Sequence, residues 1–134
     1  LNGLDYGDTN TLAIGSINEI SSRIVNVDTS AARTLLDFDT AVGSGQYILA
    51  NIKYIRITNV DDANYVELVI NGASNNSCCF KLEAGKTFMV GAGSSVVEAN
   101  DSAAITSASF ANLDTITAKA NTAAVDLQVF VAST

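Results

Sequence analysis

The residue types that most often carry out catalysis are scarce in this chain. It contains no histidine, which removes the commonest general base, the commonest metal ligand and every triad built on an imidazole. Carboxylates remain, and Asp37 and Asp39 lie two residues apart, which on a strand places both on one face, as a glycosidase pair requires. Such enzymes hold sugar rings on aromatic platforms, whereas this chain has no tryptophan. We therefore expect solvated acids at a strand end, no catalytic residues and no enzyme.

Oxygen ligands for a hard cation occur in two polar segments. Asp61, Asp62 and Asn64 fall in one expected turn, and Asn100 with Asp101 forms a second, weaker cluster. Neither segment has the spacing of an EF-hand loop, and turns use Asp and Asn in any case. Ordinary turns are the favoured interpretation, with a weak calcium site in the first turn as the alternative. We expect no resident metal or cofactor.

Two adjacent cysteines, Cys78 and Cys79, stand in an expected strand. Neighbours on a strand point to opposite faces, so an ordinary disulfide between the two is disfavoured, and no other cysteine is present. We expect a pair of small strand residues, one buried and one not. An intermolecular disulfide and a reactive thiol are the alternatives.

The chain lacks the features that bind phosphate or nucleic acid. Fourteen acids against seven bases give a formal net charge of −7, and the bases stand singly along the sequence. Nucleic-acid binding requires clustered Lys and Arg. The Gly-Ala-Gly-Ser-Ser sequence of residues 91–95 lacks the lysine and the following helix of a phosphate-binding loop. Nucleic acid is therefore not an expected partner.

Composition places the chain among ordered globular domains. With 134 residues, 48% of them hydrophobic and 16% charged, it can bury a core without disulfides. No apolar run approaches the roughly 20 residues that span a bilayer, and residues 1–19 show no secretory signal. We expect no membrane partner.

Alternating apolar and polar residues predict strands along most of the chain. The clearest case is the last run, where Val125, Leu127, Val129 and Val131 form one apolar face. Further strands are predicted at residues 23–27, 33–38, 46–58, 65–70, 78–82, 87–90 and 114–119, with residues 55, 57, 66, 68 and 70 facing the core.

Turn residues suggest how these strands are paired. The loop at residues 28–32 predicts a hairpin between the strands on either side of it. Asn71-Gly72 is a strong turn signal, and residues 65–70, 78–82 and 87–90 predict a three-stranded meander.

Two segments lack firm periodicity. Residues 1–19 are expected to form an N-terminal arm or loop, in which residues 11–14 could form one short strand. Ser16 and Glu19 match a helix capping box, but two serines follow, so no helix is expected there. Residues 91–112, with weak strand signals at 96–97 and 104–105, should hold short edge strands or act as a contact loop.

Short strands, frequent turns and the lack of a convincing amphipathic helix predict an all-β fold. We expect an antiparallel, jelly-roll-like β-sandwich, with residues 1–19 as an arm and residues 20–134 as a single domain. Because the chain has no proline, its sheet edges must be protected by charge, bulges, loops or a partner chain. A partner chain on these edges would make the protein a homo-oligomer.

Three segments carry a resemblance to a known class of proteins. They are Tyr-Ile-Arg-Ile-Thr-Asn at 54–59 with the turn and strand that follow, Phe-Lys-Leu-Glu-Ala-Gly-Lys-Thr-Phe at 80–88, and the run at 113–127. Across residues 54–131 the chain resembles small β-rich virion structural proteins of tailed bacteriophages. The resemblance implies a capsid decoration or cement protein, located in the virion, that binds the major capsid protein or other virion proteins and stabilises the head shell. A neck, tail or fibre domain is the variant of this interpretation.

The rival from another class is a carbohydrate- or receptor-binding β-sandwich of a phage tail fibre or a bacterial surface protein. Its sugar-binding face would require exposed aromatic side chains. The candidates are Tyr6, Tyr47, Tyr54 and Tyr65, most of which are expected to pack against neighbouring strands instead.

Overall fold

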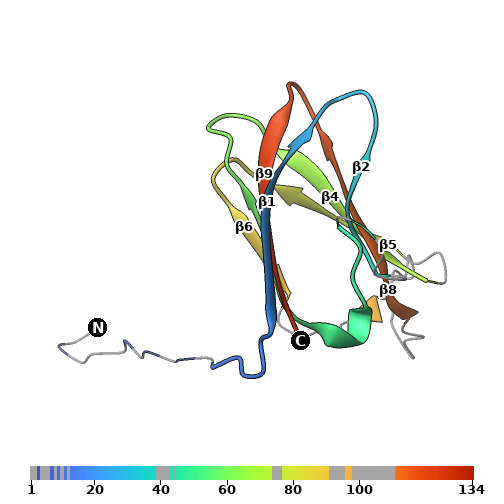
Figure 1. Ribbon diagram of the computed structural model, residues 1–134. Coiled ribbons are helices and arrows are strands. Elements are labelled where there is room, and N and C mark those ends of the chain that lie inside the picture. Colours follow the sequence, from blue (N-terminus) through green and yellow to red (C-terminus); the bar gives the residue numbers. More distant parts are fainter. Residues whose placement is uncertain are drawn as a thin grey trace, which may run out of the picture.

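The chain folds as two antiparallel sheets packed face to face (Figure 1). The computed structural model describes residues 13–38, 45–73, 77–90, 96–97 and 111–134, together with residues 3, 7, 9, 11 and 43. Sheet A contains, in spatial order, β1 (Glu19–Val27), β9 (Val125–Ser133), β3 (Ile52–Asn59) and β6 (Thr87–Val90). Sheet B contains β2 (Arg33–Asp37), β8 (Ala111–Ala120), β4 (Val66–Gly72) and β5 (Ser77–Leu82), and the short β7 (Val96–Val97) pairs with β8. A 3₁₀ turn, η1 (Leu49–Asn51), precedes β3, so the strand predicted at residues 46–58 begins at Ile52 instead.

The strand order is that of a jelly roll. The strands form four antiparallel pairs in the order β1–β9, β2–β8, β3–β6 and β4–β5. Joined end to end, these pairs make one long hairpin that turns at the β4–β5 connection. Rolling this hairpin up places β9 against β3 and β8 against β4, which completes the two sheets. The predicted antiparallel β-sandwich of jelly-roll type is therefore confirmed.

Two predicted strand pairings are wrong. The segments at 23–27 and 33–38 do not form a hairpin, because β1 belongs to sheet A and β2 to sheet B. Residues 65–70, 78–82 and 87–90 do not form a meander either, since β4 pairs with β5 but β6 crosses to sheet A and pairs with β3. Turn residues reverse the chain equally well within one sheet and between two, so composition does not distinguish a hairpin from a sheet-to-sheet crossing.

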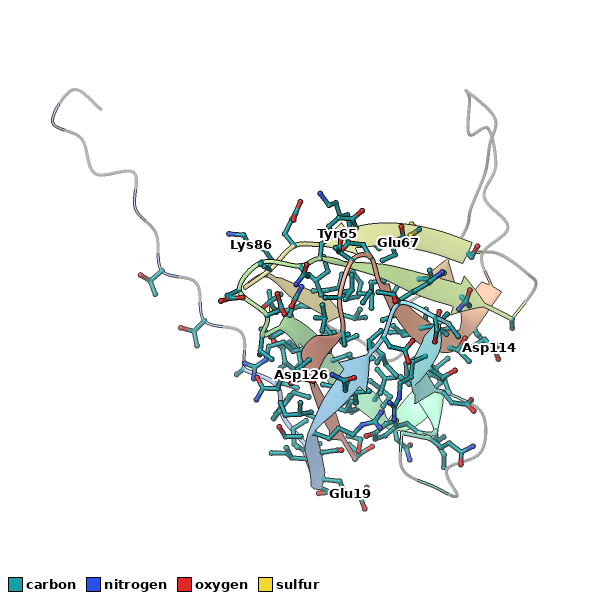
Figure 2. All side chains as sticks on the ribbon, turned by 90° about the horizontal axis from the view of Figure 1, so that it is seen from above. Glu19, Tyr65, Glu67, Lys86, Asp114 and Asp126 are labelled. Carbon is teal, nitrogen blue, oxygen red and sulfur yellow. The ribbon has the colours of Figure 1, made fainter. Side chains whose placement is uncertain are left out.

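The core lies between the sheets and follows the predicted alternation. The inward side chains at 55, 57, 66, 68 and 70 are buried, as are Val125, Leu127, Val129 and Val131 of β9. Leu35, Leu36 and Ile116 complete the layer from sheet B. Figure 2, a view from above, shows Tyr65 and Glu67 along one layer of the sandwich, and Glu19 and Asp126 along the other.

The described residues just before β1 form no helix. Ser16 has a positive φ of 58°, and Glu19 is the first residue of β1, so the capping-box match is not used. Thr11, Ala13 and Ile14 lie outside any strand, contrary to the short strand considered there. The weak signal at 96–97 does correspond to a strand, β7, whereas residues 104–105 lie outside the described part of the chain.

Four connections meet at one end of the sandwich, at the top of Figure 1. They are residues 28–32, 60–65, 83–86 and 121–124. A backbone hydrogen bond from Asn121 N to Tyr65 O joins two of these connections, and bonds from Ala120 N to Asp28 O and from Val60 N to Asp126 O join connections to neighbouring strands. The opposite end carries η1, the start of β1 and the C-terminal residue.

Candidate functional site

Of the two carboxylates singled out in the sequence, Asp37 and Asp39, the structure describes Asp37. Asp37 is half-buried at the end of β2, where its backbone pairs with Gly45 and Tyr47 and its Oδ2 lies 3.5 Å from Gln46 Nε2. Asp39 lies outside the described residues. The pairing of Asp37 with Asp39 therefore stays a prediction.

In the turn after β3, the carboxylate of Asp61 binds the backbone. Asp61 Oδ1 accepts hydrogen bonds from the backbone N–H groups of Ala63 at 2.8 Å and Asn64 at 2.6 Å. These bonds stabilise the ionised form and lower the pKa of Asp61 below its ordinary value. Asp62 is exposed. Within the described residues, no three His, Cys, Asp or Glu side chains gather closely enough to hold a metal ion. Asn100, Asp101 and the segment at 91–95 lie outside the described residues.

One buried polar residue in this region was not singled out from the sequence. Asn59 is fully buried, and its Nδ2 donates to Asn64 O at 2.9 Å and to Leu82 O at 3.1 Å. Its Oδ1 accepts from Asp61 N at 3.0 Å. Asn59 therefore joins the end of β3 in sheet A to the end of β5 in sheet B. The residue type suggested only a turn, because its partners lie on strands whose pairing the sequence does not reveal.

The two cysteines occupy opposite faces of the edge strand β5. Cys78 faces the inside of the sandwich opposite Ile70 and is half-buried, whereas Cys79 lies opposite Val69 and is exposed. Both are free thiols. The predicted division into an inner and an outer residue therefore holds, although the inner one is only half-buried.

The three tyrosines that the structure describes do not gather on a single surface. Tyr47 packs against the core, Tyr54 lies on the outer face of sheet A, and Tyr65 lies beneath the Lys81 ammonium at 4.3 Å. Tyr6 lies outside the described residues. The three described tyrosines therefore form no shared aromatic platform.

The outer face of sheet A, called face A below, carries most of the unusual surface chemistry. Its members point away from the core on all four strands, and they are Ile20, Ser22, Ile24 and Asn26 of β1, Asp126, Gln128 and Phe130 of β9, Tyr54, Arg56 and Thr58 of β3, and Thr87 and Met89 of β6. Ile20 is 65% exposed, Ile24 60% and Met89 61%. Large apolar side chains are thus open to solvent at both edges of one sheet.

Strand β1 is the clearest sign that face A differs from an ordinary solvated face. Its second half buries Val25 and Val27, which fixes the register. The same register turns Ile20 and Ile24 outward and turns Arg23 toward sheet B, where its guanidinium donates to Leu35 O. The first half of β1 therefore exposes aliphatic residues while a charged residue points inward.

The centre of face A is a connected aromatic and sulfur cluster. Arg56 Cζ lies 5.2 Å from the centre of the Phe130 ring, and Tyr54 meets the same ring edge-on at 6.2 Å between centroids. Tyr54 OH donates to Met89 Sδ at 3.1 Å. Arg56 Nε is buried and has no hydrogen-bond partner among the described residues, and the guanidinium makes a cation–π contact with the Phe130 ring.

The outer face of sheet B has a different character. Glu67 lies between Lys81 and Lys119 in the strand register, and Lys81 pairs with Glu83 at 2.5 Å. The exposed hydroxyl of Thr34 lies opposite Thr117 on the same face. Among the described residues, the outer face of sheet B thus has the charged, hydroxyl-rich character of a solvated sheet, whereas face A combines exposed aliphatic and sulfur side chains with half-buried aromatic rings.

A small cavity lies at the end of the sandwich opposite the four loops. It has a volume of about 300 Å³ and is lined by Glu19, Gln46, Tyr47, Ile48, Asn51, Ser133 and Thr134. One carboxylate, two amides, two side-chain hydroxyls and one tyrosine could hydrogen-bond a small neutral, hydroxylated molecule.

No family model matches the chain, and no curated protein matches it. A solved structure described as "Bacillus endospore appendages form a novel family of disulfide-linked pili" is similar to 96% of this chain and 98% of its own, with 14% sequence identity and a TM-score of 0.43. A likeness this weak says nothing about function. Among the described residues, no helix has the length and hydrophobicity needed to cross a membrane.

Proposed function

We propose that the chain is a non-enzymatic structural subunit that acts by binding other protein subunits through face A. The observation that carries the proposal is the exposure of Ile20, Ile24 and Met89 on one sheet face around the Arg56–Phe130 cluster. An exposed patch of this kind, rimmed by polar residues such as Asn26 and Asp126, is typical of a protein interface.

In its finer form the proposal places the chain in a virion, as a decoration or cement protein on the head shell of a tailed phage. The strand and turn pattern of residues 54–131 supports it, and jelly rolls occur in viral capsid domains. Since jelly rolls also occur in lectins, the fold by itself does not decide function. In this role face A would contact the major capsid protein or a second copy of the chain.

Particle composition tests this proposal. Mass spectrometry of purified particles of the phage that encodes the chain should detect the wild-type protein in a copy number similar to that of the shell protein. Ile24→Asp should reduce its incorporation about tenfold or more, because a charge would be buried in an apolar contact. Thr34→Asp, an exposed position on the outer face of sheet B, is the matched control and should be incorporated normally.

Two results would count against the proposal. Absence of the chain from particles would refute the virion role, and normal incorporation of folded Ile24→Asp would refute face A as the contact surface.

A second candidate, a carbohydrate-binding module, is favoured by the polar lining of the 300 Å³ cavity. Glycan-array binding by the full chain that is lost in Glu19→Ala but kept in Ile24→Asp would favour this candidate over the structural one. No binding to any glycan at protein concentrations up to about 100 μM would remove it.

A further inference from the structure

We propose that the partner of face A is face A of a second copy, related by a two-fold axis that runs along the strands. This inference rests on the proposed function, because it names the partner of the same surface. It follows from the order of side chains across the four strands.

Cross-strand registers arrange face A in rows. One row runs from Ser22 through Phe130 and Arg56 to Met89, because Ser22 pairs with Phe130, Phe130 with Arg56, and Arg56 with Met89. The adjacent row runs from Ile24 through Gln128 and Thr58 to Thr87 in the same way. Each row thus begins and ends on an edge strand of sheet A, β1 or β6, and has two residues on the central strands β9 and β3.

A two-fold axis along the strands keeps each row in place and reverses its order in the second copy. Arg56 then faces Phe130 of the second copy, and Phe130 faces the second copy's Arg56. In the adjacent row, Gln128 and Thr58 face each other, and Ile24 covers the methyl group of Thr87. In the first row the Arg56 guanidinium therefore lies against an aromatic ring, and in the second row the Gln128 amide lies against the Thr58 hydroxyl. Neither row brings like charges together.

The other two-fold axis in the plane of the face, across the strands, gives poorer partners. It would place the two central rows over each other, so that Arg56 faces Thr58 and Phe130 faces Gln128. The Phe130 ring would then lie against an amide, and Arg56 would contact Phe130 of its own copy but not Phe130 of the second copy. Charge and polarity therefore favour the axis along the strands.

The size of face A predicts a weak pair. Four strands about 4.8 Å apart and seven residues of about 3.3 Å each cover roughly 19 by 23 Å, or on the order of 400 Å² of flat area in each copy. A pair would therefore cover about 800 Å² of flat area in total, which is less than the roughly 1,200 Å² or more that stable specific interfaces bury and falls in the range of weak, transient contacts. We expect a dissociation constant on the order of 10 μM, strong enough to act when many copies are held on an assembly.

Mixing two charge variants tests the pairing. Sedimentation equilibrium of the wild-type chain should show a monomer–dimer equilibrium. Phe130→Arg alone should weaken the dimer tenfold or more, because each new guanidinium would face Arg56 of the other copy. Arg56→Glu alone should weaken it similarly, because a carboxylate would face the Phe130 ring. An equimolar mixture should regain dimer, since Arg at 130 of one copy then faces Glu at 56 of the other.

The matched control mixture is Thr117→Arg with Lys119→Glu, on the outer face of sheet B, and each of these variants should dimerise like the wild type. Circular dichroism verifies that all variants are folded. Should Arg56→Glu fail to fold, Ile24→Lys and Thr87→Glu form a second complementary pair on the same axis. A wild-type chain that stays monomeric at about 1 mM, or a mixture of folded variants that stays monomeric, would overturn the proposal.

These outcomes are separate from failure of the proposed function. If Ile24→Asp is lost from particles while the variant mixture fails to dimerise, face A binds a different protein and the structural role stands. If the dimer forms but Ile24→Asp is incorporated normally, the pairing stands and the proposed attachment through face A fails.

Discussion

Threonine substitutions at two adjacent positions of β1 should have sharply different effects on stability. Val25 is buried, and its replacement by threonine places a hydroxyl in the core at a cost of about 2 kcal/mol. Ile24 is 60% exposed, so only about two-fifths of a burial worth roughly 1.5–3 kcal/mol is at stake, and threonine keeps the β-branch. Ile24→Thr should therefore cost less than about 1 kcal/mol.

Urea unfolding followed by far-ultraviolet circular dichroism measures both values, at a protein concentration of about 1 μM where the proposed dimer is dissociated. For a domain of this size, 2 kcal/mol corresponds to a fall in Tm of about 8 °C, and Ile24→Thr should lower Tm by less than about 4 °C. Ile24→Thr should weaken self-association at higher concentration, whereas Val25→Thr should not do so while folded. Equal losses, or a larger loss for Ile24→Thr, would mean that β1 is shifted by one residue, and the description of face A would be wrong.

Three further predictions concern the loop end and the edge strand. Because hydrogen bonds lower the pKa of Asp61, its carboxylate stabilises the fold at neutral pH, and this contribution is lost as pH falls below about 5. Asp61→Asn should therefore reduce the fall of Tm at acid pH in a plot of Tm against pH. An unchanged fall of Tm in this variant would contradict the prediction. Asn59→Leu should cost about 3 kcal/mol in urea unfolding, since it orphans buried groups in both sheets, and a loss below about 1 kcal/mol would contradict the linking role. A thiol reagent should label Cys79 before Cys78 in the native protein, with Cys79→Ser as the control, and equal rates would contradict the orientation of β5.

Local periodicity identified the strands but not their partners. The alternation of β9 predicted its buried face, because one strand against one core needs only a period of two. The partners of β9 are β1 and β3, which are separated from it by some 70 to 100 residues, and no local signal specifies contacts at that distance. The predicted hairpin and meander failed for this reason. The turn signal at Asn71-Gly72 was also misplaced, because both residues belong to β4 and the chain leaves the strand only after Gly72.

The candidate surface was hidden in the sequence by the same limitation. Ile24 next to Val25 gives apolar residues on both faces of β1, which a single strand cannot explain if only one of its faces is buried. Val25 and Val27 face the core, which leaves the outward Ile20 and Ile24 and the inward Arg23 unexplained by burial. Ile20 and Ile24 lie on the same face of sheet A as Phe130 and Met89. Ile20 and Ile24 leave more than half of their surface in water, and several such residues gathered on one face are typical of an interaction surface. Apolar residues on both parities of an edge strand are therefore the sequence signal for face A, and the pairing of β1 with β9 shows which parity faces outward.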